Sequence, residues 1–123
     1  MRASSMTRVV SEYAAGLLYR AELRESARRE RVQTLRDRLP LAVAALARLG
    51  ATRVVLFGSL RTGESHDRSD VDLAVEGICA SHYWRAVDVA SRELGVTVDL
   101  VPLEEASPSL RARIQEEGEV LFG

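Results

Sequence analysis

The stretch VVLFGSLRTGESHDRSDVDLAVE, residues 54–76, decides the fold and carries the candidate site. It starts with apolar, β-branched residues, which predict a buried strand over residues 52–57. A Gly-Ser pair at 58–59 ends that strand, and a polar loop follows. Strict alternation of polar and apolar residues then predicts a second strand, with Asp70 and Asp72 on one of its faces. The stretch therefore places a glycine turn beside two carboxylates.

Carboxylates two positions apart on a strand are suited to binding a hard cation. Their Cα atoms lie about 6.5 Å apart on one side of the strand, and Mg²⁺ prefers a few carboxylates together with waters and substrate phosphates. Three acids buried on one sheet face without a cation would cost several kcal/mol. Asp70 and Asp72 therefore predict a site for one or two magnesium ions, of the kind that assists phosphoryl displacement. Asp99, on a later strand, would complete it as a ligand or as the base for an attacking hydroxyl.

The Gly-Ser turn supplies the groups that would hold phosphate. Gly58 permits a tight turn and lets a phosphate approach the backbone N–H groups. Ser59 adds a hydroxyl at the expected start of a helical turn, where N–H groups are free for an anion. Arg61 can donate two hydrogen bonds to a phosphate, and Ser69 is a further candidate contact. The loop and the acids together predict a metal-assisted phosphate site.

Helices and strands alternate along the rest of the chain. We expect helices over 7–39, 40–49, 82–94 and 108–117, and strands over 70–76, 96–101 and 119–122. Pro40 is expected to open the second helix, because a proline kinks a helix interior. Ser81 is expected to cap the third helix, with Trp84 pointing into the core. The pattern predicts an α/β (α+β) domain with a short mixed sheet of about four strands, covered by helices.

The first helix is predicted to carry an apolar stripe, with Val10, Leu17 and Leu35 on one face, and a middle that is nearly all charged. Such a thin stripe packs on its own domain, on a second copy or on a foreign partner, and the sequence leaves these open. Residues 1–50 hold 10 Arg and 5 acids, giving +5, whereas residues 51–123 hold 7 Arg and 13 acids, giving −6. Coding bias, or contact of this half with an acidic partner surface or nucleic acid, would each explain the excess of arginine.

The single cysteine, Cys79, excludes a disulfide within one chain and a cysteine-based metal site. A reducing cytoplasm is therefore the expected compartment. Glu12 interrupts the first apolar run, so no secretory leader is expected. No stretch reaches the roughly 18 apolar residues of a membrane span, so no membrane contact is expected. The near-zero net charge makes nucleic acid an unexpected partner.

The sequence GSLRTGESHDRSDVDLAV, residues 58–75, resembles the nucleotidyltransferase signature of the DNA polymerase β superfamily: Gly-Ser, Arg-x-Gly, then Ser-Asp-x-Asp-Leu after a short loop. It is most similar to the minimal nucleotidyltransferase (MNT) branch, small domains that often act as antitoxins beside a HEPN-type RNase toxin. The segments VTVDLVPLEEA and IQEEGEVLFG also look like that branch. The resemblance divides the chain into a helical extension, residues 1–38, and an MNT domain, residues 39–123.

The resemblance implies a function for this chain. An MNT antitoxin transfers AMP from ATP to a tyrosine of its HEPN toxin, with Mg²⁺ as cofactor, and blocks the RNase. The residues at matching positions are Gly58, Ser59, Arg61 and Ser69 for the nucleotide, and Asp70, Asp72 and Asp99 for the metal and catalysis. A homodimer or a hetero-oligomer with the toxin would suit such a protein.

Two other functions stay open from the sequence. A small-molecule nucleotidyltransferase of the aminoglycoside type shares the signature, but such enzymes carry a second domain for the acceptor. A non-catalytic antitoxin would instead neutralise its partner by binding alone, through the arginine-rich helix. The intact set of acids argues against the second alternative. Nucleotide choice cannot be assigned, because no residue identifies the base.

Overall fold

The computed structural model describes residues 2–58 and 71–123, with side chains from residue 8 onward. In this part of the chain four strands form one sheet in the order β3-β2-β1-β4. The strands are β1 (Arg53–Phe57), β2 (Val71–Glu76), β3 (Val98–Pro102) and β4 (Glu119–Phe122). The helices are α1 (Arg2–Arg48), α3 (Tyr83–Leu94) and α4 (Pro108–Glu117), with short 3-10 turns η1 (Ala80–His82) and η2 (Leu103–Glu105). This arrangement confirms the predicted α+β fold with a mixed sheet and a long N-terminal helix.

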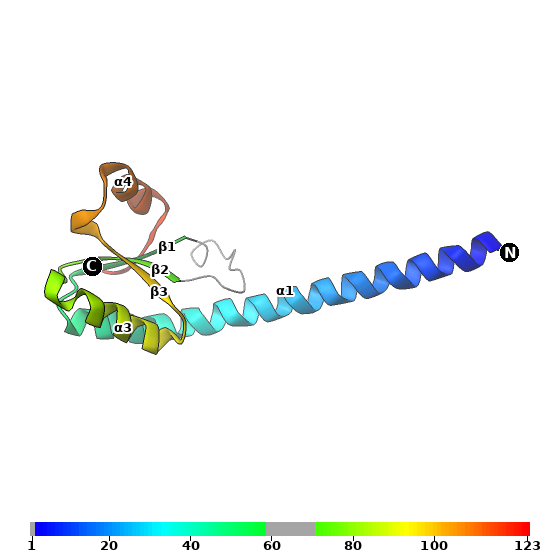
Figure 1. The fold of residues 1–123 in the computed structure, drawn as a ribbon, viewed down its shortest axis with the longest axis horizontal. Coiled ribbons are helices and arrows are strands. Elements are labelled where there is room, and N and C mark those ends of the chain that lie inside the picture. Colours follow the sequence, from blue (N-terminus) through cyan, green and yellow to red (C-terminus); the bar gives the residue numbers. More distant parts are fainter. Residues whose placement is uncertain (1, 59–70) are drawn as a thin grey trace.

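The sheet is antiparallel at one end and parallel at the other. Strand β1 pairs antiparallel with β2 and β4, whereas β2 pairs parallel with β3. Parallel neighbours need a crossover, and α3 provides it between β2 and β3. Figure 1 shows α3 beside the carboxyl-terminal part of α1 on one side of the sheet, and α4 on the other. The two faces of the sheet are therefore covered by different helices.

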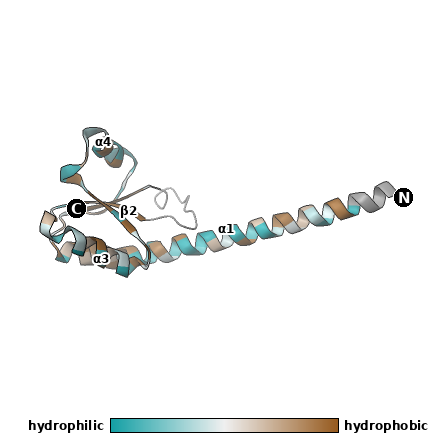
Figure 2. Cartoon of the chain, in the orientation of Figure 1, coloured by the Kyte–Doolittle hydropathy of each residue, from teal (hydrophilic) through white to brown (hydrophobic). Residues whose placement is uncertain are grey.

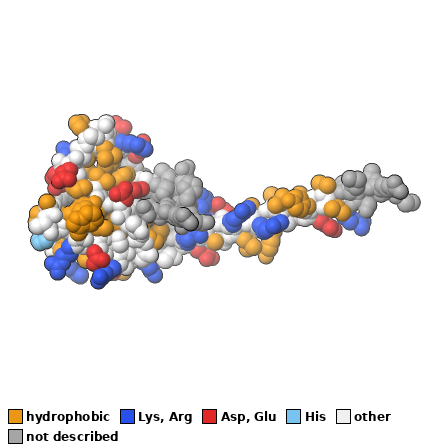
Figure 3. Space-filling model, in the orientation of Figure 1, with side chains coloured by type: hydrophobic (Ala, Val, Ile, Leu, Met, Phe, Trp, Pro, Cys, Tyr) orange, Lys and Arg blue, Asp and Glu red, His pale blue; other side chains and the backbone are white. Residues whose placement is uncertain are grey.

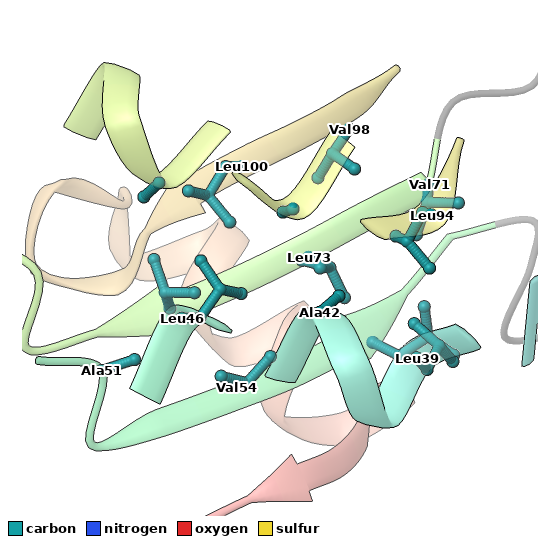
Figure 4. Packing of buried hydrophobic residues seen from close by; sticks show 14 of the residues in the cluster. Leu39, Ala42, Leu46, Ala51, Val54, Val71, Leu73, Leu94, Val98 and Leu100 are labelled. Carbon is teal, nitrogen blue, oxygen red and sulfur yellow. The ribbon is translucent and has the colours of Figure 1, made fainter. Parts of the chain in front are cut away.

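The larger core lies between the sheet and the layer formed by α1 and α3 (Figure 4). Each strand contributes alternate residues to it, as the pleat requires. Its fully buried side chains include Leu46, Val54, Leu56, Val71, Leu73, Leu94 and Leu100. A smaller cluster under α4 contains Val55, Ala74, Leu103 and Ile114. The face under α4 is thus the one left for polar residues of the strands.

The predicted helix break at Pro40 is wrong, because α1 continues through this residue. The helix runs without interruption from Arg2 to Arg48, with Pro40 inside it. A proline removes one backbone hydrogen bond from the helix. The buried side chains Leu39 and Ala42 hold the helix against the sheet on both sides of Pro40, which offsets that loss. The two predicted helices, 7–39 and 40–49, are therefore one element.

Helix α3 starts and packs differently from the prediction. Ser81 lies in η1, and the helix begins after His82, whose side chain makes no capping hydrogen bond. Trp84 is 77% exposed, so the prediction that it is a core residue is wrong. The buried positions are Ala86, Ala90 and Leu94, whose small side chains let α3 lie close to α1. The tryptophan side chain instead faces solvent.

The ends of α3 and α4 follow the predicted capping residues. Gly95 ends α3 with φ at +73°, in the left-handed region that favours glycine. The Ser107 hydroxyl accepts a hydrogen bond of 3.2 Å from the N–H of Leu110 at the start of α4. Gly118 ends α4 before β4. These local signals were sufficient to position the elements.

The first part of α1, residues 8–31, projects from the domain and is called the arm below (Figures 1 and 2). Its middle carries intrahelical ion pairs: the Glu25 carboxylate lies 2.7 Å from the Arg28 guanidinium and 3.4 Å from that of Arg29. The hydrogen bond from Arg28 lowers the pKa of Glu25. Within the described ranges, no helix has both the length and the apolar character to cross a membrane.

Candidate functional site

Asp72 and Asp99 lie side by side on neighbouring strands. In the parallel pairing of β2 with β3, Asp72 is the register partner of Asp99, which places their Cα atoms about 4.8 Å apart. Both strands turn these residues away from the larger core, because the flanking residues Val71, Leu73 and Val98 are buried in it. The two carboxylates therefore share the face of the sheet that α4 partly covers.

Gly58 is the third component of the site and lies against the Asp72 carboxylate. It follows β1, whose last residue Phe57 is the register partner of Asp72. Its φ is +77°, which favours glycine. A Cβ atom at Gly58 would lie 2.2 Å from Asp72 Oδ2 and 3.0 Å from its Cγ. The glycine backbone therefore packs directly against the carboxylate, and no other residue fits without moving it.

The two acids differ in exposure. Asp72 is half-buried, and Asp99 is exposed. The expectation that all the acids would be buried is therefore wrong for Asp99, and the desolvation argument for a metal is weaker there than the sequence suggested. Among residues 8–58 and 71–123 no side chain hydrogen-bonds to Asp99 or forms an ion pair with it. Its oxygens are open to a ligand from outside this part of the chain.

Four of the predicted site residues lie outside the described residues: Ser59, Arg61, Ser69 and Asp70. Among the residues that are described, no group of three acidic, histidine or cysteine side chains gathers as a metal site would require. Asp72 and Asp99 contribute two carboxylates, and Asp70 precedes the first residue of β2. A third ligand from Asp70 remains a prediction from the strand pattern.

A polar pocket of about 350 Å³ lies on the same face of the sheet, at the end opposite the acid pair. Arg53, Glu76 and Arg111 line it, and Arg111 donates a hydrogen bond to the carbonyl of Leu103. The Nε atom of Arg53 is buried and has no hydrogen-bond partner within the described part of the chain. Sequence reasoning missed this pocket, because its residues come from five elements and form no local motif.

The comparisons with known proteins agree on one family. The family model for the nucleotidyltransferase domain matches residues 39–121. A solved structure assigned to a minimal nucleotidyltransferase is 34% identical, with a TM-score of 0.66, and the match covers 72% of this chain and 93% of that one. No protein with a curated description matches the chain.

Two further solved structures are toxin–antitoxin complexes. One, crystallised with AMP-PNP, is 29% identical with a TM-score of 0.60, and the match covers 66% of this chain and 69% of that one. The other is a variant of the MntA–HpeT complex with two Asp-to-Glu substitutions two positions apart. It is 25% identical with a TM-score of 0.53, and the match covers 78% of this chain and 72% of that one.

Proposed function

Because this chain belongs to the nucleotidyltransferase domain family, we propose that it is an antitoxin that transfers AMP from ATP to a tyrosine hydroxyl of a partner HEPN toxin. The observation that carries the proposal is the pairing of Asp72 with Asp99, closed by the Gly58 turn. Carboxylates on neighbouring strands beside a glycine turn suit the transfer of a nucleotide with its phosphates. The transfer would neutralise the toxin.

The donor set fits a magnesium ion. Asp72 and Asp99 offer carboxylate oxygens, the ligand type that Mg²⁺ prefers, and Asp70 would add a third carboxylate from the start of β2. Bound there, Mg²⁺ would neutralise charge on the phosphates of ATP. The two Asp-to-Glu substitutions in the MntA–HpeT complex have the same spacing as Asp70 and Asp72, which supports the assignment.

The remaining residues would bind the nucleotide and move a proton. The backbone at Gly58, with Ser59, Arg61 and Ser69, would hold the triphosphate. Asp99, which is exposed and has no described partner, would accept the proton of the acceptor hydroxyl. The hydroxyl oxygen forms the new bond to the α-phosphorus of ATP, the bond from that phosphorus to the bridging oxygen breaks, and pyrophosphate leaves.

The partner assignment rests on the toxin–antitoxin structures. One such complex was crystallised with AMP-PNP, an ATP analogue, which supports ATP as donor and a toxin as acceptor for this chain. An acceptor from another protein is therefore favoured over an aminoglycoside-type substrate. A cytoplasmic location fits this role and the single cysteine.

A non-catalytic antitoxin is the second candidate, because the exposed arm offers a binding surface. One experiment separates the candidates. The purified chain is incubated with ATP, Mg²⁺ and the product of the neighbouring gene, and the intact mass of each protein is measured. Mass gain of the partner by whole AMP units supports the transfer. Tight binding without mass gain supports the non-catalytic antitoxin and contradicts our proposal. ATP consumption with a small-molecule acceptor only would contradict both.

A further inference from the structure

The arm exposes large apolar side chains to an unusual extent. Between 44% and 66% of the surface of each remains exposed for Val9, Val10, Tyr13, Leu17, Leu18, Tyr19 and Leu23. Figure 3 shows hydrophobic side chains gathered along this part of the helix. Single exposed apolar residues are ordinary on a soluble protein, but a contiguous group marks an interaction surface. We therefore expect another protein surface to cover these side chains.

Three of these seven residues, Val10, Tyr13 and Leu17, lie on one side of the helix, and the other four lie elsewhere around it. At 3.6 residues per turn, Val10, Tyr13, Ala14, Leu17 and Ala21 fall within an arc of about 100°, and we call these five residues the stripe. The buried residues Leu35, Leu39, Ala42 and Leu46 fall in the same arc further along α1. One apolar face therefore follows the whole helix, and it meets the sheet only in its last third.

Three arginines interrupt this face between the stripe and the buried part. Arg24, Arg28 and Arg31 fall in the same arc, and Arg28 is already paired with Glu25 at 2.7 Å. The segment that holds the stripe is by contrast electrically balanced, with Arg8 and Arg20 against Glu12 and Glu22. The stripe therefore carries no net charge that would select a charged partner.

We propose that the stripe packs against the stripe of a second copy of this chain, with the two arms antiparallel. The stripe is complementary to itself in that direction. About a two-fold axis next to Gly16, Val10 lies opposite Ala21 of the other copy, and Ala14 lies opposite its Leu17. Val10 and Leu17 each meet an alanine, which is the alternation that close helix packing favours, whereas Tyr13 lies at the level of the other copy's Leu18.

The charges select the antiparallel direction. In a parallel pair Arg24 and Arg28 would face their own copies along the contact, with repulsion at both levels. In the antiparallel pair these arginines lie beyond the overlapping stripes. The Glu and Arg residues of the segment then have no like-charged residue at the same level of the other arm. Both the packing and the electrostatics therefore favour two-fold symmetry.

The oligomeric state of the full chain tests the pairing. Sedimentation velocity over a range of concentrations should show a dimer. Tyr13 and Tyr19 form a matched pair, since they are 64% and 62% exposed, but Tyr13 belongs to the stripe whereas Tyr19 lies about 170° around the helix from the centre of the stripe. Tyr13→Glu should raise the dissociation constant at least tenfold, whereas Tyr19→Glu should leave it within about threefold. A monomer at 100 µM, or equal effects of the two substitutions, would overturn the proposal.

A distance measurement tests the direction. Spin labels are placed at Gln33→Cys in a Cys79→Ser background, because both native side chains are exposed. Position 33 lies 35 residues along the axis from its counterpart in the antiparallel pair, or about 50 Å at 1.5 Å per residue. In a parallel pair the labels would be less than about 20 Å apart, and that result would overturn the antiparallel arrangement. The test needs no toxin or ATP, so its outcome is independent of the proposed transfer.

Discussion

Gly58 lies so close to Asp72 that a methyl group on its Cα would be 2.2 Å from Oδ2 of the carboxylate. Two consequences follow for Gly58→Ala. The positive φ of +77° costs an L-residue about 1–2 kcal/mol in stability. The methyl group also displaces the Asp72 carboxylate, so nucleotide transfer should fall at least a hundredfold. Transfer to the toxin is measured by intact mass, and stability by urea unfolding.

Gly95→Ala is the matched control for this substitution. Gly95 has a similar φ of +73°, and within the described part of the chain its added methyl group meets only Nη1 at the far end of Arg38, a flexible side chain. Gly95→Ala should therefore lose similar stability and keep its activity. If both alanine variants lose activity equally, the loss comes from stability and not from contact with Asp72.

Asp99→Asn tests the assigned role of this carboxylate. The change removes a negative ligand and a proton acceptor, so transfer should fall by about 10²–10⁴-fold. Stability should change by no more than about 0.5 kcal/mol, because Asp99 is exposed and has no described partner. Glu76→Gln is the control, since Glu76 lies on the same face about 13 Å along β2 from the acid pair. Full activity in Asp99→Asn would contradict the mechanism.

Much of this site was predictable from the sequence, and the reason is periodicity. Alternation in β2 and β3 assigns Asp72 and Asp99 to one face of each strand without any knowledge of the fold. The register that makes them neighbours is a tertiary property, set by the parallel crossover through α3. The close contact between Gly58 and Asp72 depends on that register and on the turn after β1. Neither could be derived from local patterns.

The wrong predictions share a physical cause: in each, tertiary packing overrode a local sequence preference. Pro40 was expected to break a helix that tertiary packing on both sides holds together. Trp84 was expected in the core because of its helical spacing with Val87 and Leu94, but α3 turns its small residues Ala86 and Ala90 inward. Packing between helices selected the smaller side chains. Local rules succeeded where nothing competed with them, as at the Ser107 cap.

The exposure of Trp84 leads to a stability prediction. Trp84→Ala should lower the free energy of unfolding by less than about 1 kcal/mol, because the ring is 77% exposed and its main described contact is the edge of Tyr83. Leu94→Ala, on the buried side of the same helix, should cost about 2–5 kcal/mol. Urea unfolding of both variants measures the difference. A loss of several kcal/mol in Trp84→Ala would show that the tryptophan is covered in solution.

Pro40→Ala tests whether the proline inside α1 lowers the free energy of unfolding. The alanine restores a backbone N–H inside α1, and proline is about 3 kcal/mol less favourable than alanine in a helix interior. Proline also restricts the unfolded chain, which reduces the gain by about 0.4–1 kcal/mol. The free energy of unfolding should therefore rise by about 1–3 kcal/mol. Leu41→Ala, a neighbouring exposed position, should leave it nearly unchanged.

Unfolding of both position-40 and position-41 variants should be measured in the Tyr13→Glu background. Dimerisation makes the apparent stability depend on protein concentration, and the background substitution weakens that dependence if the arms pair as proposed. A decrease in stability for Pro40→Ala would mean that the proline ring itself holds α1 against β4. The ring lines a groove with Leu121 and Phe122, so the two effects oppose each other. Because the groove is open and Pro40 is exposed, we expect the gain in stability from the restored backbone N–H to exceed the loss from the missing ring contacts.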